Sequence, residues 1–452
     1  MMKRRGLFLL SLLLSLSLIL TGCGSGQPTA RPSPEPSEST APPETTTAPI
    51  EFVPGQSTDL MAGIQAAAWT GSTGAPDPAQ FATVNQFAAE LFQQSTKSNA
   101  EGNLMISPAS VFLALAMTLN GAEGETRTAM LDALTRKGLD VAQINALSRA
   151  WIAWLNRSSE QTTVSINNAI WFDQDFVPER PFLQTNADYY QAAAHKLDFA
   201  DPATVDVIIS WVKAATKGKI EGIVDKIDDN VVMYLINAIY FLADWQTPFD
   251  ANDTREQVFQ APSGEVTVPF MHRTGQMAYF PGLSAEGVAL PYADGQFEFF
   301  AILPEGGQAP REWLAAQDAA TVFADLSALM ATSESGLELS LPKFEVRFED
   351  SLKDELSGLG MGLAFTPGEA DFAGMTANKD LELYINEVRH KTFVRVDEKG
   401  TEAAAVTSVE VGVTSMPVSE RQLVFDRPFV YGILDIATGL PLFVGILEHP
   451  GA

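Results

Sequence analysis

The sequence predicts an α+β fold in which helices and strands are largely segregated along the chain. Apolar residues recur at helical spacing mainly before residue 216, whereas runs rich in Val, Ile, Phe and Tyr dominate later. Because helices and strands do not alternate regularly, we expect antiparallel or mixed sheets rather than a doubly wound parallel sheet. With 452 residues, 46% of them hydrophobic, the chain can bury a large core.

The first 22 residues have the pattern of a bacterial lipoprotein signal peptide. Basic residues at positions 3 to 5 precede an apolar run over residues 7–20, which is shorter than the roughly 20 residues of a membrane span. The sequence Leu-Thr-Gly-Cys at residues 20–23 resembles a lipobox, and Cys23 is the only cysteine. We therefore expect export and a lipid anchor on Cys23 in the bacterial cell envelope, with the domain outside. An uncleaved anchor with a chance cysteine is the alternative.

A linker rich in Pro, Ser, Thr, Glu and Ala follows over residues 23–58. It holds eight prolines between residues 24 and 55. Pro-rich chain extends by about 3.1 Å per residue, so some 30 residues could hold a domain roughly 90 Å from a membrane. Residues 59–76 are expected to connect the linker to a domain over residues 77–452, with a short helix between residues 59 and 69.

The acidic balance of the chain excludes some partners. The formal net charge is −27, and loss of a signal with three basic and no acidic residues would bring it to −30. Such a charge repels nucleic acids and anionic lipids, so we expect membrane contact only through the lipid on Cys23. One cysteine allows no disulfide within the chain, so the fold must rely on its core. We expect a monomer.

Helices are predicted where apolar residues follow a period near 3.6. Residues 84–92 form one buried stripe. Ser107 can cap and Pro108 suits a first turn, so a nearly all-apolar, buried helix should begin there and end near Asn120. Further helices are predicted over residues 125–134, 142–155, 180–192 and 203–216.

Strands are predicted where β-branched and aromatic residues form short runs. These runs cover residues 165–172, 231–241, 297–304, 337–349, 381–388, 391–398 and 423–435.

No enzyme motif emerges from the sequence. The chain has only four histidines, none at the His-x-x-x-His spacing of a zinc site: His195, His272, His390 and His449. A Gly-x-Ser-x-Gly nucleophile elbow and a phosphate-binding glycine-rich loop are both absent from the sequence. We therefore expect no catalytic residue, no metal and no cofactor.

Residues 398–417, EKGTEAAAVTSVEVGVTSMP, read as one long strand between Gly400 and Pro417. Side chains of a strand alternate between its two faces, so this segment suits a strand buried on one side. One face carries small or β-branched residues: Thr401, Ala403, Ala405, Thr407, Val409, Val411 and Val413. The other carries Glu402, Ala404, Val406, Ser408, Glu410 and Gly412.

From about residue 77 to its end, the chain resembles the serpins, the serine protease inhibitor family. Any one of the matching segments is a weak signal, but six occur in the family's order. They are NLMISPASVFLALAMTLNGAEGETRTAM, WVKAATKGKIEGIV, LINAIYFLADWQTPFD, LPKFEVRFEDSLKDELSGLGMGLAF, NEVRHKTFVRVDEKGTEAAA and DRPFVYGILDIATGLPLFVGILEHP.

The resemblance implies helices packed around three mixed or antiparallel β-sheets, with an exposed reactive-centre loop that inserts into the main sheet after a target protease cleaves it. Insertion would trap the covalent acyl-enzyme in a 1:1 complex. The loop hinge corresponds to Glu398, Gly400, Thr401, Glu402, Ala403, Ala404 and Ala405, whose small residues suit an inhibitor. Residues of the region where the sheet opens correspond to Ser107, Ser110, Asn237, His390 and Trp245.

Counting fourteen residues from Gly400, as the loops of the family do, places the cleaved bond between Thr414 and Ser415. Val413 and Arg421 are rival positions for the residue before the cut, and the prime side is longer than the common family spacing. Between Gly400 and Glu420 there is no Lys, Arg, Leu or aromatic residue. An elastase-like serine protease with a small apolar pocket is therefore the expected partner, and a subtilisin-like one the alternative.

Two other functional classes remain as alternatives. A serpin-like protein without inhibitory activity would use the domain for binding or storage. An acidic lipoprotein on a Pro-rich linker also fits a solute-binding protein of a transporter, but that class predicts a two-lobed α/β fold, which the segregated elements do not favour.

Overall fold

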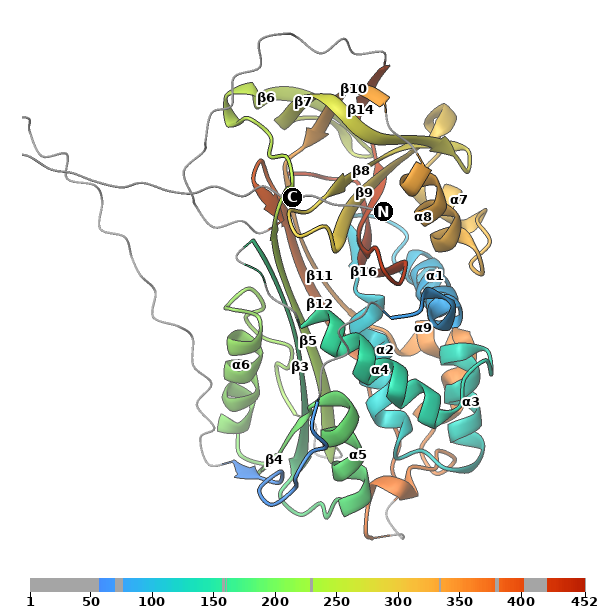
Figure 1. The fold of residues 1–452 in the computed structure, drawn as a ribbon. Coiled ribbons are helices and arrows are strands. Elements are labelled where there is room, and N and C mark those ends of the chain that lie inside the picture. Colours follow the sequence, from blue (N-terminus) through green and yellow to red (C-terminus); the bar gives the residue numbers. More distant parts are fainter. Residues whose placement is uncertain are drawn as a thin grey trace, which may run out of the picture. The chain divides into compact units, whose positions relative to one another are not determined.

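The computed structural model describes residues 57–69, 76–156, 159, 161–227, 231–332, 335–378, 382–401 and 421–451. The contacts divide the chain into Met1–Ala48 and Pro49–Ala452, and all described residues belong to the second unit. Within the described ranges, no helix is both long and apolar enough to cross a membrane. The architecture is that of an α+β protein, as the sequence predicts, with helices around large mixed sheets (Figure 1).

Most helices lie in the first half of the chain, as predicted. Ser107 caps α2 by accepting the backbone N–H of Ser110, and α2 is buried along almost its whole length. The helices are α1 (Ala82–Ser98), α2 (Pro108–Leu119), α3 (Gly124–Thr135), α4 (Val141–Leu155), α5 (Arg180–Tyr190), α6 (Ala203–Ala215), α7 (Pro310–Ala315), α8 (Val322–Thr332) and α9 (Lys353–Leu356).

The main sheet has seven strands in the order β1-β4-β3-β5-β13-β12-β11. α2 and its neighbours lie on one face of this sheet and α6 lies on the other (Figure 1). We call the face covered by α6 the front face. The strands are β1 (Thr58–Asp59), β3 (Thr162–Asp173), β4 (Ala193–Leu197), β5 (Met233–Asp244), β11 (Phe344–Ser351), β12 (Arg389–Val396) and β13 (Gly400–Thr401).

The second sheet has the order β14-β10-β7-β8-β9-β15-β16-β2, and β6 pairs with β7 beside this path. The 19-residue β7 joins its two parts, because its first part pairs with β6 and β10 and its last residues pair with β8. The two parts of this path, together with the seven-stranded sheet, correspond to the three predicted sheets, and β7 belongs to both parts. The strands are β2 (Leu104–Ile106), β6 (Arg255–Ala261), β7 (Gly264–Gly282), β8 (Ala285–Pro291), β9 (Phe297–Pro304), β10 (Ser335–Pro342), β14 (Arg421–Val424), β15 (Phe429–Asp435) and β16 (Leu440–Leu447).

The structure corrects the predicted elements at several places. Residues 59–69 form no helix; β1 pairs with β4, and Leu60 and Trp69 pack on the core. Residues 382–388 form no strand, because they border the cavity described below instead of a neighbouring strand. The predicted strand over residues 337–349 is two strands that part at Lys343, and residues 423–435 likewise contribute to both β14 and β15.

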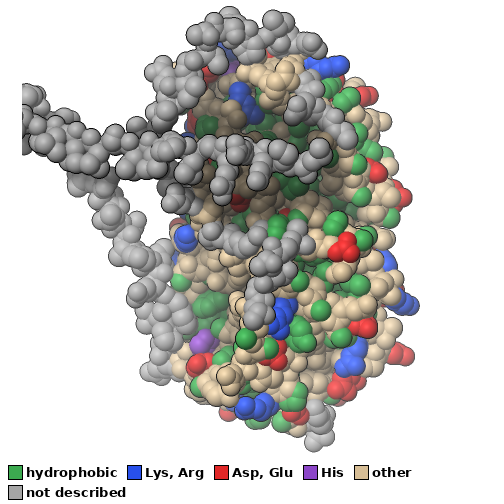
Figure 2. Space-filling view, viewed as in Figure 1, with side chains coloured by type: hydrophobic (Ala, Val, Ile, Leu, Met, Phe, Trp, Pro, Cys, Tyr) green, Lys and Arg blue, Asp and Glu red, His purple; other side chains and the backbone are tan. Residues whose placement is uncertain are grey.

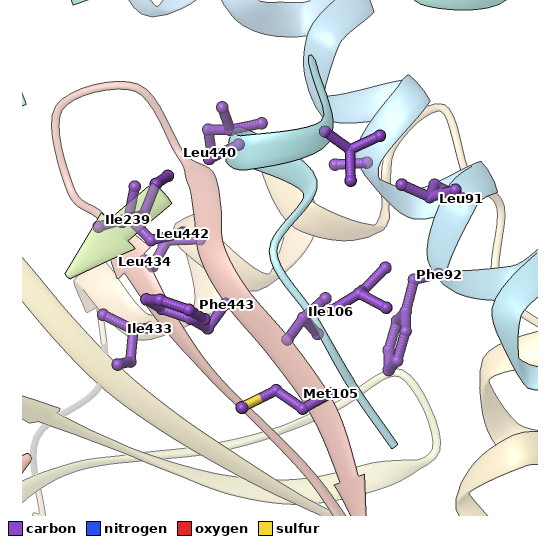
Figure 3. Packing of buried hydrophobic residues seen from close by; sticks show 14 of the residues in the cluster. Leu91, Phe92, Met105, Ile106, Ile239, Ile433, Leu434, Leu440, Leu442 and Phe443 are labelled. Atoms are coloured by element: carbon purple, nitrogen blue, oxygen red, sulfur yellow. The ribbon is translucent and has the colours of Figure 1, made fainter. Parts of the chain in front are cut away.

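The hydrophobic core packs α1 against strands of the second sheet. Leu91 and Phe92 of α1, Ile106 of β2 and Phe443 of β16 are fully or almost fully buried and pack in one cluster (Figure 3). On the front face, Trp171 of β3 belongs to a second buried cluster that α6 covers. The surface seen in Figure 2 carries Asp and Glu interspersed with Lys and Arg.

Candidate functional site

A slot divides the main sheet between β5 and β12. β5 pairs with β3 and β13, and β12 pairs with β11 and β13. Although both strands are described in full, they form no ladder with each other. Of the residues that the structure describes, only the two of β13 lie between them, at one end of the slot. The remaining length of the slot is therefore flanked by two strand edges that face each other.

Of the predicted hinge residues, Gly400 and Thr401 lie at the filled end of the slot. Thr401 pairs with Ala243 of β5 and with Val396 of β12. Its side chain is buried, and its hydroxyl shares a short hydrogen bond with the hydroxyl of Tyr292. Thr401 thus faces the core side of the sheet, as the predicted alternation of this segment requires.

Gly400 is needed because two backbones meet here. A Cβ atom at this position would lie 2.0 Å from the carbonyl oxygen of Ala243. Since no side chain fits at that separation, substitution of Gly400 would push β13 away from β5.

Trp245 holds the backbone that leads into β13. Its backbone N–H donates to the carbonyl of Lys399 over 2.7 Å, and its indole N–H donates to the carbonyl of Asp397 over 2.9 Å. The indole stacks on the ring of Tyr292 with centroids 4.7 Å apart. Trp245 therefore lies at the filled end of the slot.

Glu398 is fixed by charged and polar contacts. Its carboxylate lies 2.7 Å from Nζ of Lys343 and accepts the hydroxyl of Thr254 over 2.8 Å. Burial by itself would raise the pKa of Glu398, but these hydrogen bonds and a backbone N–H hold it below its usual value. The hinge is thus anchored in its ionised form immediately before the inserted pair.

Four residues that the resemblance assigns to the sheet-opening region lie about halfway along the slot: Ser107, Ser110, Asn237 and His390. Nε2 of His390 accepts the backbone N–H of Ser107 over 2.9 Å, and the hydroxyl of Ser110 donates to the carbonyl of Asn237 over 3.3 Å. Burial lowers the pKa of His390 to about 4, so the imidazole is neutral at pH 7. α2 therefore links β12 to β5 from behind the sheet, whereas Trp245 stands apart from these four residues.

Two residues at the site were not singled out from the sequence. Asn168 of β3 accepts the side-chain N–H of Asn237 over 2.7 Å and donates to the carbonyl of Tyr190. A polar residue on the buried face of a strand was a visible signal for Asn168. Tyr292 gave no such signal, because its role arises from a contact across 109 residues of sequence.

Below these residues the slot opens into a cavity of about 330 Å³. Val224, which packs on the front face, and Ala114 of α2, behind the sheet, both line it. A smaller cavity beside Asn237 and His390 is likewise lined from both faces. The space therefore passes through the sheet, and a strand added there would be covered on both sides.

A Ser–His pair outside the slot does not form a catalytic dyad. Ser340 Oγ lies 2.8 Å from Nδ1 of His272, but Nε of Arg255 donates to the other ring nitrogen over 3.1 Å. Nδ1 of the neutral ring then carries the proton and cannot accept one from Ser340. Among the described residues, no group of three or more His, Cys, Asp or Glu side chains could hold a metal ion.

Several predicted positions lie outside the described residues. They are Cys23, the hinge residues Glu402, Ala403, Ala404 and Ala405, and both sides of the predicted cleavage site, Thr414 and Ser415.

Comparison with known proteins gives a consistent result. Residues 82–450 match the family model described as serpin (serine protease inhibitor). A serpin-like protein of Thermococcus kodakarensis is 31% identical over 377 residues, which cover 81% of this chain and 85% of that protein. Alpha-1-antiproteinase F of Cavia porcellus is 30% identical over 369 residues, covering 80% and 89%. The crystal structure of the thermophilic serpin tengpin in the native state superposes with a TM-score of 0.79 at 36% identity, covering 87% of this chain and 100% of that one.

Proposed function

The chain belongs to the serpin family, and we propose that it inhibits an elastase-like serine protease outside the cell by inserting its cleaved reactive loop into the slot. The single observation that carries this proposal is the position of Thr401, which already pairs with both walls of the slot. The remaining slot length supports the proposal because it offers two facing strand edges and a covered cavity.

The register of β13 predicts how the inserted strand would lie. Continued from Thr401, it places Ala403 opposite Phe241 and Val394, and Ala405 opposite Ile239 and Thr392. Residues that lie opposite each other in antiparallel strands point to the same face of the sheet. The small side chains of Ala403 and Ala405 would therefore point, like that of Thr401, toward the core. The next residue on this face, Thr407, would lie opposite Asn237 and His390. The same register brings Val411 level with Met233, where β5 begins.

Trapping would then depend on a competition. The protease serine attacks the carbonyl carbon of Thr414, and the amine of Ser415 leaves with a proton from the protease histidine. The ester that results would be hydrolysed unless insertion moves the protease first. The chain needs no catalytic group of its own for this step, which agrees with the absence of an enzyme motif in the sequence.

Specificity and location rest on the sequence. The lack of Lys, Arg, Leu and aromatic residues near the proposed bond favours a protease with a small apolar pocket. The signal pattern, Cys23 and the Pro-rich linker support display of the domain on the bacterial cell envelope through a lipid. The target protease would then be met outside the cytoplasm.

The test uses Pro49–Ala452, the unit that contains all the described residues. It is mixed with pancreatic elastase and analysed by a denaturing gel and by mass spectrometry. We expect a stable adduct and a released peptide that begins at Ser415, and no adduct with elastase whose serine is blocked beforehand. Cleavage without an adduct, at any protease ratio, would overturn the proposal and favour a serpin without inhibitory activity.

A further inference from the structure

The segment that follows α6 crosses the slot on the front face. Gly218, with a φ of 82°, donates its N–H to the carbonyl of Lys213 and turns the chain back toward the sheet. Ile220 is buried and packs with α6 against Ile236 and Ala238 of β5. This segment therefore belongs, by its packing, to the half of the sheet that contains β3 and β5.

Lys219 in this segment contacts the opposite half. The backbone carbonyl of Lys219 accepts a hydrogen bond from Nη1 of Arg347, on β11, over 3.2 Å. The ammonium group of Lys219 lies 5.4 Å from the ring centre of Phe393 on β12. The guanidinium of Arg347 lies 4.5 Å from the same ring centre. Glu345 pairs with Arg347 at 2.9 Å, which offsets the two neighbouring positive charges.

The matching contact on the near half does not cross the slot. Nζ of Lys217 lies 4.8 Å from the ring centre of Tyr240, which belongs to β5. Lys217 and Lys219 thus make the same kind of cation–π contact from one turn, but only Lys219 reaches the other wall. Beneath this turn, Ile220 and Thr392 line the same small cavity from the two sides.

We propose that Lys219, Arg347 and Phe393 form a clasp that holds the two walls of the slot together on the front face, and that its release is a step of sheet expansion. An entering strand must separate β5 from β12, and the segment that carries Lys219 moves with β5 because Ile220 packs there. The contacts to Arg347 and Phe393 then stretch or break. The inference rests on the proposed insertion mechanism and assigns positioning roles to these residues within it.

The test compares Arg347→Ala and Arg347→Lys with the matched control Lys217→Ala in the full chain. After the loop is cut with a protease, the time course of the gain in heat resistance reports insertion. Arg347 has 57% of its side chain exposed, so its variants should fold. We expect Arg347→Ala to insert about three- to tenfold faster than wild type. Arg347→Lys should be intermediate, because it keeps a cation but loses the planar donor, and Lys217→Ala should stay within about twofold of wild type.

The outcomes separate the two proposals. If the cut wild-type chain gains heat resistance but Arg347→Ala inserts at the wild-type rate, the clasp is overturned and the insertion mechanism stands. An equal acceleration by Lys217→Ala would also overturn the clasp, because that contact stays on one wall. If the cut wild-type chain gains no heat resistance, both proposals fail.

Discussion

Nε2 of His390 accepts the backbone N–H of Ser107 over 2.9 Å, and this bond joins β12 to the start of α2. The same helix turn reaches β5 through Ser110 and the carbonyl of Asn237. The two walls of the slot are therefore connected from behind by a chain of hydrogen bonds. Only a neutral imidazole can accept at Nε2, so the connection depends on the protonation state of His390.

We expect stability to fall in acid because of His390. Burial lowers its pKa from the ordinary value of 6.5, which applies to the unfolded chain, to about 4 in the folded protein. Between these two values the unfolded chain binds a proton that the folded chain does not. Stability should therefore decline from pH 6.5 to about pH 4, by up to about 3 kcal/mol from this group. Urea unfolding at several pH values measures the slope.

His390→Gln is the matched variant for this pH dependence. It should reduce the dependence of the unfolding free energy on pH between pH 6.5 and 4. Part of this dependence should remain, because burial also lowers the pKa values of His195 and His272. A slope in His390→Gln equal to that of wild type would show that His390 does not titrate in this way.

His390→Ala should ease opening of the slot. The substitution leaves the N–H of Ser107 buried without its acceptor, which costs about 1–3 kcal/mol, and adds a cavity between the walls. We expect a lower unfolding temperature and faster spontaneous insertion or polymerisation on mild heating, followed on native gels. Unchanged thermal stability without polymers would contradict the role given to this histidine.

Much of the fold could be predicted because its signals are local. The cap of α2 lies in the two residues Ser107 and Pro108, and the runs of β-branched and aromatic residues that predict β3 and β5 are visible in their sequences. The alternation after Gly400 by itself predicts that Thr401 lies on the buried face. Each of these features depends on neighbours in sequence.

The parts that escaped prediction depend on distant contacts. β7 was missed because its 19 residues change partners along their length and show no single alternation. Tyr292 and Asn168 acquire their roles only when β3, β5 and β13 come together. Residues 59–69 look helical in isolation, but in the fold they lie along β4 and α5. Asp188 of α5 accepts a hydrogen bond from the backbone N–H of Ala67 over 2.6 Å.

Asp188→Ala should loosen that N-terminal segment. The carboxylate accepts from Ala67 and from Gln184, and the backbone carbonyl of Asp188 accepts the indole N–H of Trp69. Loss of the side-chain bonds should cost about 1 kcal/mol and expose residues 60–69 to proteolysis. Asp188→Asn keeps an acceptor oxygen and should behave nearly as wild type. Equal proteolysis of all three proteins would mean that Asp188 does not hold the segment.

If the chain inhibits as proposed, Thr401→Arg should turn it into a substrate. Thr401 is 1% exposed and packed between Ala243, Val396 and Tyr292, so an arginine there must bury an unpaired charge or stay out of the slot. In either case insertion becomes slower than hydrolysis of the acyl-enzyme, so the protease is released. On a denaturing gel with elastase we expect cleaved chain and no adduct, whereas Thr401→Val, which keeps the shape, should still form one. A wild-type yield of adduct from Thr401→Arg would exclude insertion at this position.

Thr414→Arg tests which bond the protease attacks. Trypsin-like proteases carry an Asp in their specificity pocket and select Arg before the cut, whereas the native loop offers them no basic residue between Gly400 and Glu420. The variant should therefore form an adduct with trypsin and lose its adduct with elastase, and the released peptide should begin at Ser415. Val413→Arg is the control, displaced by one residue. If Val413→Arg gives the trypsin adduct and Thr414→Arg does not, the attacked bond is Val413–Thr414, and the inserted strand ends one residue earlier.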